Sequence, residues 1–231
     1  MSKLAFIFPG QGAQKAGMGK DFYENSEAAR SFFDQAQKIL DFDLKEMCFG
    51  EHEELNLTEY TQPCMVSVCL AIVQELKKRG INPDITAGLI LGEYAAVAAA
   101  GGMNELDAIK LVRRRGILMQ STVPAGEGAM AAVLGLDAKK IEKILESFEN
   151  VWIANYNCPG QIVITGLTNE VQQASLALKE AGAKRVVELK VSGPFHSLLL
   201  KPAGEALLKE MESCLLYTSP SPRDKRQSRM P

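Results

Sequence analysis

Residues 128–191 read GAMAAVLGLDAKKIEKILESFENVWIANYNCPGQIVITGLTNEVQQASLALKEAGAKRVVELKV. Apolar and β-branched runs at 129–136, 151–155, 161–166 and 185–191 predict four strands, and segments of helical period at 138–148 and 169–181 predict two helices. The resulting order, β-α-β-β-α-β, is that of the ferredoxin-like unit. Val123-Pro124 precedes it and Ser192-Gly193-Pro194 follows it, so we predict a small domain at 123–192, inserted into a larger one.

The chain before this stretch alternates short apolar runs with helical segments. The run 3–8 (KLAFIF) ends at a proline and a glycine, and the run 85–91 leads into an alanine-rich helix at 93–100. Between these runs we expect one long helix from about 21 to 40 and a second that begins at Pro63 and ends at Arg79. This alternation favours an α/β layer structure. We assign 1–122 to the first part of a large α/β domain and 193–213 to the return of the chain to it.

Composition narrows the function classes. The 231 residues are 46% hydrophobic and 23% charged, which suits folded domains, and the net charge of -2 gives no basic field for nucleic acid or an anionic membrane surface. No apolar run reaches the roughly 18 residues of a membrane span, and MSKLAFIF lacks the pattern of a secretory signal, so we expect a cytoplasmic protein. Five cysteines without a C-x-x-C pair suggest neither a disulfide framework nor a zinc site.

The last eighteen residues, 214–231, differ from the rest. CLLYTSPSPRDKRQSRMP contains three prolines, three serines, four basic residues and one acid, a charge of +3. It has no periodicity and cannot bury a core, so disorder is expected. A functional basic tail and a foreign segment from a fused or misread coding sequence are both compatible with it.

A glycine-flanked turn stands where the second apolar run meets its helix. The sequence GLILG at 88–92 has the position and spacing of G-x-S-x-G, the turn that presents a nucleophilic serine and aims the next backbone N–H at a developing oxyanion. Its central residue is Ile90, so the glycine spacing of the turn is kept but the reactive hydroxyl oxygen is absent. Taken alone, two glycines four residues apart are also compatible with plain packing.

The loop FPGQGAQ at 8–14 follows the first predicted strand. It fails the dinucleotide pattern, because Lys15 stands where G-x-G-x-x-G needs its third glycine, and it fails the phosphate-loop pattern, because Met18 stands where lysine is needed. Its glycines would let a ligand or a reacting oxygen approach backbone N–H groups. A purely structural turn is the alternative.

Two side chains could carry chemistry. His196 lies on a predicted loop, where a general base can meet a residue distant in sequence, whereas His52 lies among glutamates and is interpreted as a surface residue. In the helical segment 104–120, a step of about 100° per residue puts Arg115 in the apolar sector and Arg114 outside it. A guanidinium there needs an anionic partner such as a substrate carboxylate. The alternatives are a structural histidine and an arginine that reaches solvent or pairs with an internal acid.

Several motifs then occur together in one order. They are FPGQGAQ at 8–14, TEYTQP at 58–63, AGLILGEYAA at 87–96, RGILMQ at 115–120, NYNCPGQIVITG at 155–166, and GPFHS at 193–197 followed by LKPAGEAL at 200–207. Over residues 2 to about 213, the chain resembles the malonyl-CoA:acyl carrier protein transacylases of fatty-acid synthesis. The resemblance implies an α/β-hydrolase-like large domain with a ferredoxin-like insertion. It also implies that an elbow serine takes malonyl from malonyl-CoA and passes it to the phosphopantetheine thiol of acyl carrier protein.

The resemblance assigns roles to individual residues. Ile90 stands at the position of the nucleophile, His196 would be the base, and the backbone N–H groups of Gln11 and Leu91 would form the oxyanion hole. Arg115 would bind the malonate carboxylate, and the other residues matching the pocket are Gln62 and Asn157. No metal or cofactor is implied beyond malonyl-CoA as donor, and the expected partners are malonyl-CoA and acyl carrier protein, with no nucleic acid or membrane. Members of the family are expected to be monomeric.

Two departures from the family bear on activity. Ile90 has no lone pair, so we expect an impaired or inactive copy. The family continues beyond the LKPAGEAL helix, so we expect a C-terminally truncated large domain with exposed strand edges and a tendency to aggregate. The alternative function is a non-catalytic module that binds CoA or acyl carrier protein through Arg115 and the loop of Gln11. A hydrolase is disfavoured, since it needs the same nucleophile, and the choice between malonyl and methylmalonyl stays open.

Overall fold

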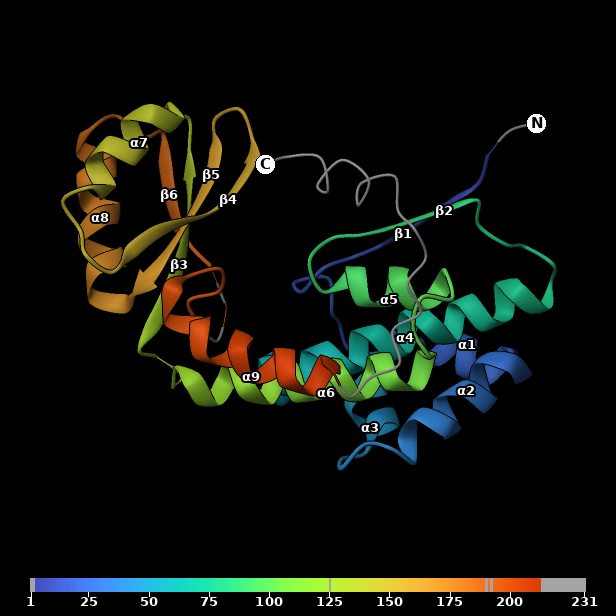
Figure 1. Cartoon of the computed structure of the whole chain (residues 1–231). Coiled ribbons are helices and arrows are strands. Elements are labelled where there is room, and N and C mark those ends of the chain that lie inside the picture. The colour runs from blue at the N-terminus through green and yellow to red at the C-terminus, as the bar shows by residue number, and fades with distance from the viewer. Residues whose placement is uncertain (1–2, 125, 190, 192, 213–231) are drawn as a thin grey trace. The chain divides into compact units, whose positions relative to one another are not determined.

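The computed structural model describes residues 3–124, 126–189, 191 and 193–212, which form two compact units (Figure 1). Among the described residues, the first unit comprises 3–55, 61–113 and 210–212, and the second comprises 56–60 and those between 114 and 209. Two of the boundaries between the units, at 60/61 and 113/114, fall inside the helices α4 (Thr58–Lys78) and α6 (Glu105–Thr122). The segment 214–231, for which disorder was predicted, lies outside the described residues.

The first unit is built on two parallel strands. β1 (Ala5–Phe8) pairs with β2 (Ile85–Gly88), and Ala5 lies opposite Ile85. α5 (Gly92–Ala99) packs on one face of the pair, where the Thr86 hydroxyl donates to the Ala96 carbonyl at 3.0 Å. The remaining helical elements are α1 (Lys20–Asn25), α2 (Glu27–Gln37), α3 (Leu44–Phe49) and a 3₁₀ turn (Glu53–Asn56). The predicted α/β layering is confirmed.

Two helix predictions for this unit were wrong. The single helix expected over 21–40 is divided into α1 and α2 at Ser26, which has an extended backbone and whose hydroxyl accepts from the Ala29 N–H at 3.1 Å. A serine in this N-cap position satisfies a helix donor and so begins a new helix. α4 begins at Thr58, and Pro63 lies inside it rather than at its start. A proline there removes only one intrahelical hydrogen bond, which packing can offset.

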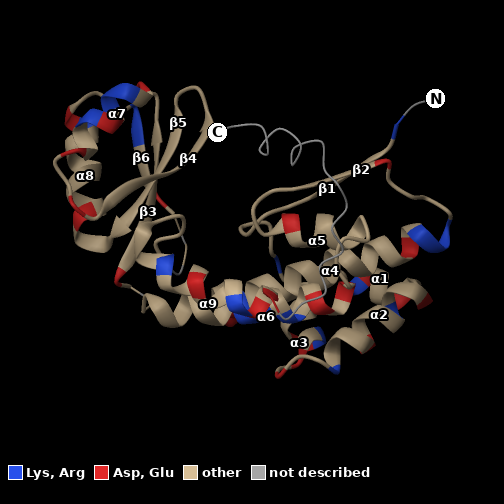
Figure 2. Cartoon of the chain, in the orientation of Figure 1, with Lys and Arg blue, Asp and Glu red and all other residues tan. Residues whose placement is uncertain are grey.

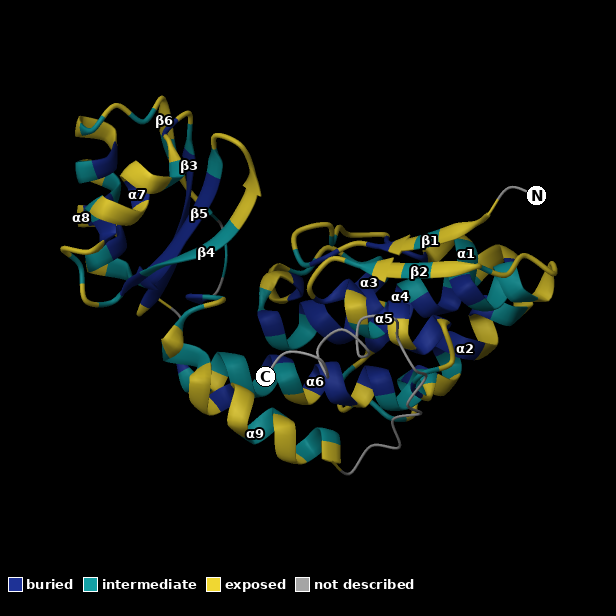
Figure 3. Cartoon of the chain, turned by 45° about the horizontal axis from the view of Figure 1, so that its top comes forward, coloured by how far each residue is buried: buried dark blue, intermediate teal, exposed yellow. Residues whose placement is uncertain are grey.

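The outer face of the strand pair is exposed. Ile7 retains 79% of its accessible surface, Ile85 retains 55%, and Leu89, which follows β2, retains 64%. Phe8, on the face towards α5, retains only 5%. Figure 3 shows β1 and β2 mostly in yellow, in contrast to the dark blue of β5 in the second unit. Parallel strands are usually covered on both faces, so this exposure is unusual.

The second unit has the predicted β-α-β-β-α-β order. Its elements are β3 (Gly128–Leu134), α7 (Ala138–Leu145), β4 (Val151–Cys158), β5 (Gln161–Leu167), α8 (Thr168–Glu180) and β6 (Arg185–Glu188). The strands lie in the order β4-β5-β3-β6, and every neighbouring pair is antiparallel. The ferredoxin-like prediction is confirmed. A 3₁₀ turn (Leu198–Leu200) and α9 (Lys201–Glu212) follow.

The two faces of this sheet differ in what covers them. α7 and α8 cover one face, where a core forms around Val133, Ile141, Ile164 and Leu178 (Figure 1). Side chains alternate between the faces of a strand, so Met130 and Ala132 point to the other face. There they join Val163 in a second, smaller core, against which the chain after β6 packs. The segment leading to His196 is therefore attached to the face that lacks helices.

Charges of both signs are mixed over the helices of the two units. Lys and Arg lie among Asp and Glu on the helices of both units, including α6 and α7 (Figure 2). In the described residues, no helix combines the length and the apolar character needed to cross a membrane.

Candidate active site

The glycine-flanked turn forms a tight corner between β2 and α5. Ile90 at its centre has φ of 53°, in the left-handed region that a β-branched residue rarely adopts. The Gly92 N–H donates to the Leu89 carbonyl at 3.0 Å, and the Glu93 N–H donates to the Ile90 carbonyl at 3.2 Å. A Cβ on Gly88 would overlap the backbone of Gly92, so the corner requires glycine there. Ile90 retains 39% of its accessible surface.

The loop after β1 lies against this corner. The Leu89 N–H donates to the Phe8 carbonyl at 3.0 Å, and a Cβ on Gly10 would come within 2.8 Å of the Leu89 carbonyl oxygen. Gln11, the next residue, is partly buried. The structure thus brings together three of the sequence-predicted residues, Gln11, Ile90 and Leu91, within the first unit.

The Leu91 N–H lies at the start of α5, where the helix dipole favours negative charge. Among the described residues, no hydrogen bond has this N–H as its donor. A backbone donor at a helix start, beside a second loop of approaching backbone, is the arrangement that stabilises an oxyanion.

Gln62 belongs to the same unit. It lies in the first turns of α4 and is fully buried, next to Thr61, whose hydroxyl donates to the Leu55 carbonyl at 2.6 Å. Its side chain is therefore held inside the protein rather than on a solvated surface.

The second unit carries His196 on a short, closed loop. The Phe195 N–H donates to the Gly193 carbonyl at 3.0 Å, and the Ser197 hydroxyl donates to the Pro194 carbonyl at 2.6 Å. His196 between them has φ of 60°. A left-handed backbone costs a residue with a Cβ roughly 1–2 kcal/mol, so the surroundings must hold this conformation.

The structure brings His196 and Arg115 close enough to interact within the second unit. Partial burial of the imidazole lowers the pKa of His196 from its usual value, and the positive charge of Arg115 lowers it further. The residue as a whole remains exposed, so one part of the ring is desolvated while another stays accessible. A histidine with a lowered pKa is neutral near pH 7 and can accept a proton. Asn157, also in this unit, is an exposed residue of β4.

Comparison with known proteins places these features in a family. A model of the acyl transferase domain matches residues 5–229. The malonyl CoA-acyl carrier protein transacylase of Bacillus subtilis (strain 168) is 50% identical over 219 residues, which cover 93% of this chain and 69% of that protein. The chain belongs to the acyl transferase family.

Within the acyl transferase family, the similar proteins are malonyl CoA-acyl carrier protein transacylases. The enzyme of that name from Staphylococcus aureus (strain MSSA476) is 47% identical over 206 residues, which cover 87% of this chain and 66% of the enzyme. The crystal structure of the Clostridium perfringens transacylase superposes with a TM-score of 0.86 at 41% identity, covering 94% of this chain and 70% of that one. The resemblance of the sequence motifs is confirmed, and the chain spans about two thirds of these relatives.

One further structure shows such an enzyme with its partner. It is a type II PKS acyl-carrier protein in complex with its malonyl-transacylase, which superposes with a TM-score of 0.86 at 39% identity and covers 92% of this chain and 71% of that one. The acyl transferase fold of this chain therefore matches a protein seen bound to an acyl carrier protein.

Sequence reasoning missed a buried guanidinium of this acyl transferase, that of Arg113. Arg113 is only 9% exposed and makes two hydrogen bonds to the Asp41 carboxylate, at 2.9 and 3.0 Å, while its guanidinium lies 5.1 Å from the centre of the Phe42 ring. Arg114 is exposed and Arg115 is partly buried. The carboxylate that binds Arg113 belongs to Asp41, far away in the sequence, so periodicity within α6 could not reveal it. An ion pair of this kind is structural.

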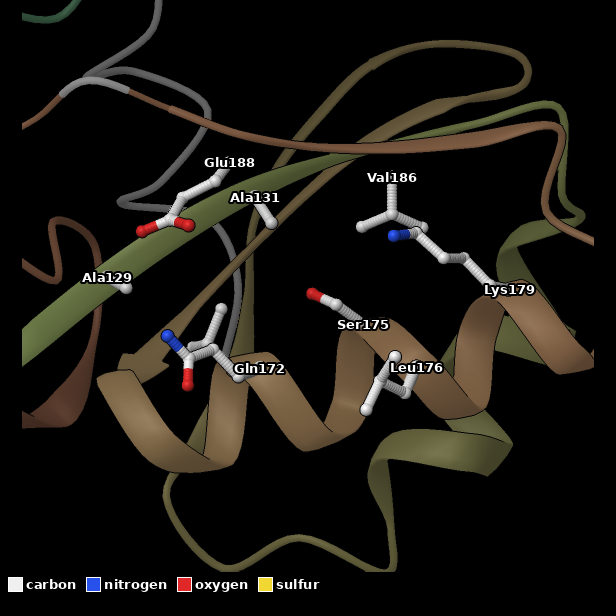
Figure 4. A pocket seen from close by; sticks show the side chains of 9 residues that line it. Ala129, Ala131, Gln172, Ser175, Leu176, Lys179, Val186 and Glu188 are labelled. Carbon is white, nitrogen blue, oxygen red and sulfur yellow. The ribbon is translucent and has the colours of Figure 1, made fainter.

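A cavity of about 250 Å³ lies elsewhere in the second unit, between α8 and the sheet (Figure 4). Its lining residues are Ala129, Ala131, Val171, Gln172, Ser175, Leu176, Lys179, Val186 and Glu188. Ala129 and Ala131 belong to the helix-covered face, whereas Phe195 packs on the opposite face. The cavity is thus separated by the sheet from the loop of His196. In the described part of the chain, no group of three or more His, Cys, Asp or Glu side chains is arranged to hold a metal.

Proposed function

We propose that this chain has the active-site framework of a transacylase that moves malonyl from malonyl-CoA to the phosphopantetheine thiol of acyl carrier protein. The observation that carries the proposal is the corner at Ile90, with its left-handed backbone, flanking glycines and adjacent loop of Gln11. The malonyl CoA-acyl carrier protein transacylases to which the chain is similar support the choice of substrate.

The mechanism is a ping-pong transfer through an acyl-enzyme. With serine at position 90, the hydroxyl oxygen attacks the thioester carbonyl while His196 accepts the proton. The N–H groups of Gln11 and Leu91 stabilise the oxyanion, and collapse of the intermediate releases CoA, whose sulfur takes the proton from His196. The phosphopantetheine thiol then gives its proton to His196 and attacks the ester carbonyl, and His196 passes this proton to the serine oxygen as the ester bond breaks and the malonyl thioester leaves. Arg115 binds the malonate carboxylate through its two-pronged guanidinium, and Gln62 and Asn157 line the acyl pocket.

Ile90 interrupts this sequence at its first step. A hydrocarbon side chain cannot form the ester, so the chain as it stands is catalytically impaired while its oxyanion donors, base and carboxylate partner remain. Retention of these groups favours a second candidate function, a module that binds malonyl-CoA or acyl carrier protein without turnover.

Acylation of two variants tests the proposal. The unmodified chain, Ile90→Ser and the matched control Ile90→Ala are incubated with radiolabelled malonyl-CoA, and covalent label is measured after denaturation. We expect label on Ile90→Ser alone, and its transfer when holo-acyl carrier protein is added. Stable label on the unmodified chain would refute the role given to Ile90, and no label on any variant would count against the transacylase framework. Calorimetric titration of the unmodified chain with malonyl-CoA tests the binding module, which requires affinity without acylation.

A further inference from the structure

The backbone of His196 is held on its two sides by different contacts. On the N-terminal side, a Cβ on Gly128 would lie 2.7 Å from the Cβ of Pro194, so the proline ring rests directly on the backbone of β3. Phe195 packs against the small core of Met130, Ala132 and Val163. These two contacts fix the loop up to residue 195 against the sheet.

On the C-terminal side, the loop is closed by Ser197. Its hydroxyl reaches back across His196 to the Pro194 carbonyl at 2.6 Å, while its own carbonyl accepts from the Leu200 N–H at 3.2 Å. The first of these bonds ties the residue after His196 to the part of the loop that is anchored on the sheet. The bond closes a turn over Phe195 and His196, and the left-handed φ of His196 is unfavourable for a residue with a Cβ.

We propose that Ser197 is a positioning residue, whose hydroxyl bond to the Pro194 carbonyl holds His196 in its left-handed conformation and so sets the direction of the imidazole. A residue with a Cβ prefers negative φ, and a change of φ swings the side chain about the backbone. Without the bond, His196 relaxes and the imidazole leaves its place beside Arg115. The inference rests on the proposed function, in which His196 is the base.

A first test needs no activity. The imidazole signals of the two histidines are followed by NMR as a function of pH, with His52→Gln used to assign His196. Burial and Arg115 both lower the pKa of His196 in the native loop, so a displaced ring loses both effects. We expect Ser197→Ala to raise this pKa towards its usual value and Ser197→Thr, which keeps the hydroxyl, to leave it unchanged.

The matched control is Ser147→Ala. The Ser147 hydroxyl also donates to the carbonyl three residues before it, that of Ile144 at 2.7 Å, at the end of α7 in the same unit. This variant should leave the His196 signal in place. An unchanged His196 pKa and chemical shift in folded Ser197→Ala would overturn the inference.

A second test uses the Ile90→Ser chain. There Ser197→Ala should lower kcat for malonyl transfer about five- to tenfold, the effect expected of one hydrogen bond, without changing KM for malonyl-CoA, and Ser197→Thr should restore it. Equal kcat values with and without the hydroxyl would overturn the positioning role. If Ile90→Ser takes up no acyl group, the proposed function fails. The positioning role of Ser197 is then tested by the NMR titration alone, which needs no activity.

Discussion

Gly92, the first residue of α5, approaches the end of β1 so closely that a Cβ on it would overlap the carbonyl oxygen of Phe8. The same Cβ would lie 2.7 Å from the carbonyl oxygen of Pro9. The strand that precedes the loop of Gln11 and the helix that follows Ile90 are thus in backbone contact. This contact is what brings the two expected oxyanion donors to one place.

Gly92→Ala should therefore destabilise the first unit. Overpacking against backbone atoms costs about 1–3 kcal/mol, because the neighbouring carbonyls cannot move as a flexible side chain would. Gly204 in α9 is the control, since a Cβ there meets nothing within 4 Å. Gly204→Ala should be neutral or stabilise by about 0.5–1 kcal/mol. Urea unfolding of both variants measures the difference, and equal stabilities would mean that the corner accommodates a methyl group.

The ion pair of Arg113 and Asp41 should give the chain a defined pH dependence. The hydrogen bond from Arg113 lowers the pKa of the Asp41 carboxyl, so the stabilisation is present above the usual aspartate pKa and is lost as the pH falls through the lower value in the folded chain. The Asp41 side chain is 66% exposed, and solvent screening limits the effect to about 1 kcal/mol.

Asp41→Asn tests this linkage. We expect it to lose about 1 kcal/mol at pH 7 and to match the parent chain once Asp41 itself is protonated. Asp107→Asn, which removes an exposed pair with Lys110 at 3.3 Å, should change stability very little at any pH. The prediction is tested by the urea concentration at the unfolding midpoint, measured between pH 2 and pH 7. A difference in midpoint between Asp41→Asn and the parent chain that stays constant with pH would contradict the linkage.

Arg115 should control the charge state of His196. Since its positive charge lowers the pKa of His196, Arg115→Gln should raise that pKa towards the usual value of about 6.5. The rise should be incomplete, because burial of the ring is the larger cause. Arg114→Gln, an equal change of charge at the exposed neighbouring position, is the control. NMR titration of the imidazole gives both values, and an equal response to the two substitutions would show that Arg115 has no special proximity.

The exposed face of β1 and β2 should make the chain self-associate. Ile7, Ile85 and Leu89 form an exposed apolar surface on the sheet of β1 and β2. In the described residues this sheet has two strands, so each of them is an edge strand. Exposed apolar surfaces and unpaired strand edges both favour association with other copies of the chain. Ile7→Lys should increase the monomer fraction in sedimentation velocity experiments. Leu208→Lys places the same charge on a residue of α9 that is 59% exposed and should have little effect. A parent chain that is fully monomeric at high concentration would refute the prediction.

The parts of this fold that local patterns encode were predictable. The β-α-β-β-α-β unit followed from strand and helix periods, and the glycines at 88 and 92 indicated a tight turn around Ile90, whose left-handed backbone the structure then showed. The division of a helix at Ser26 was not predicted, because serine is tolerated inside helices and only its bond to the Ala29 N–H reveals the cap.

Features that depend on contacts between residues far apart in the sequence were not predicted. The partner of Arg113 is 72 residues away, so helical periodicity gave Arg115 the apolar position and left Arg113 unnoticed. The left-handed backbone of His196 had no local signal either, since neither Phe195 nor Ser197 is a glycine. The Pro194 carbonyl, to which the Ser197 hydroxyl donates, belongs to a residue that is anchored on Gly128 by a tertiary contact, and such a contact has no local sequence signal.

The strand order of the second unit has a mechanical consequence. β3 and β6 are neighbours, so the chain enters and leaves the sheet at one end, where Pro194 rests on Gly128. A shift of β3 should therefore move Pro194 and, with it, the loop that carries His196. The hairpin tip between β4 and β5, by contrast, is remote along the chain from both connections and turns through Gly160 with φ of 79°. Lengthening of that hairpin could accumulate during evolution without disturbing the loop that carries His196.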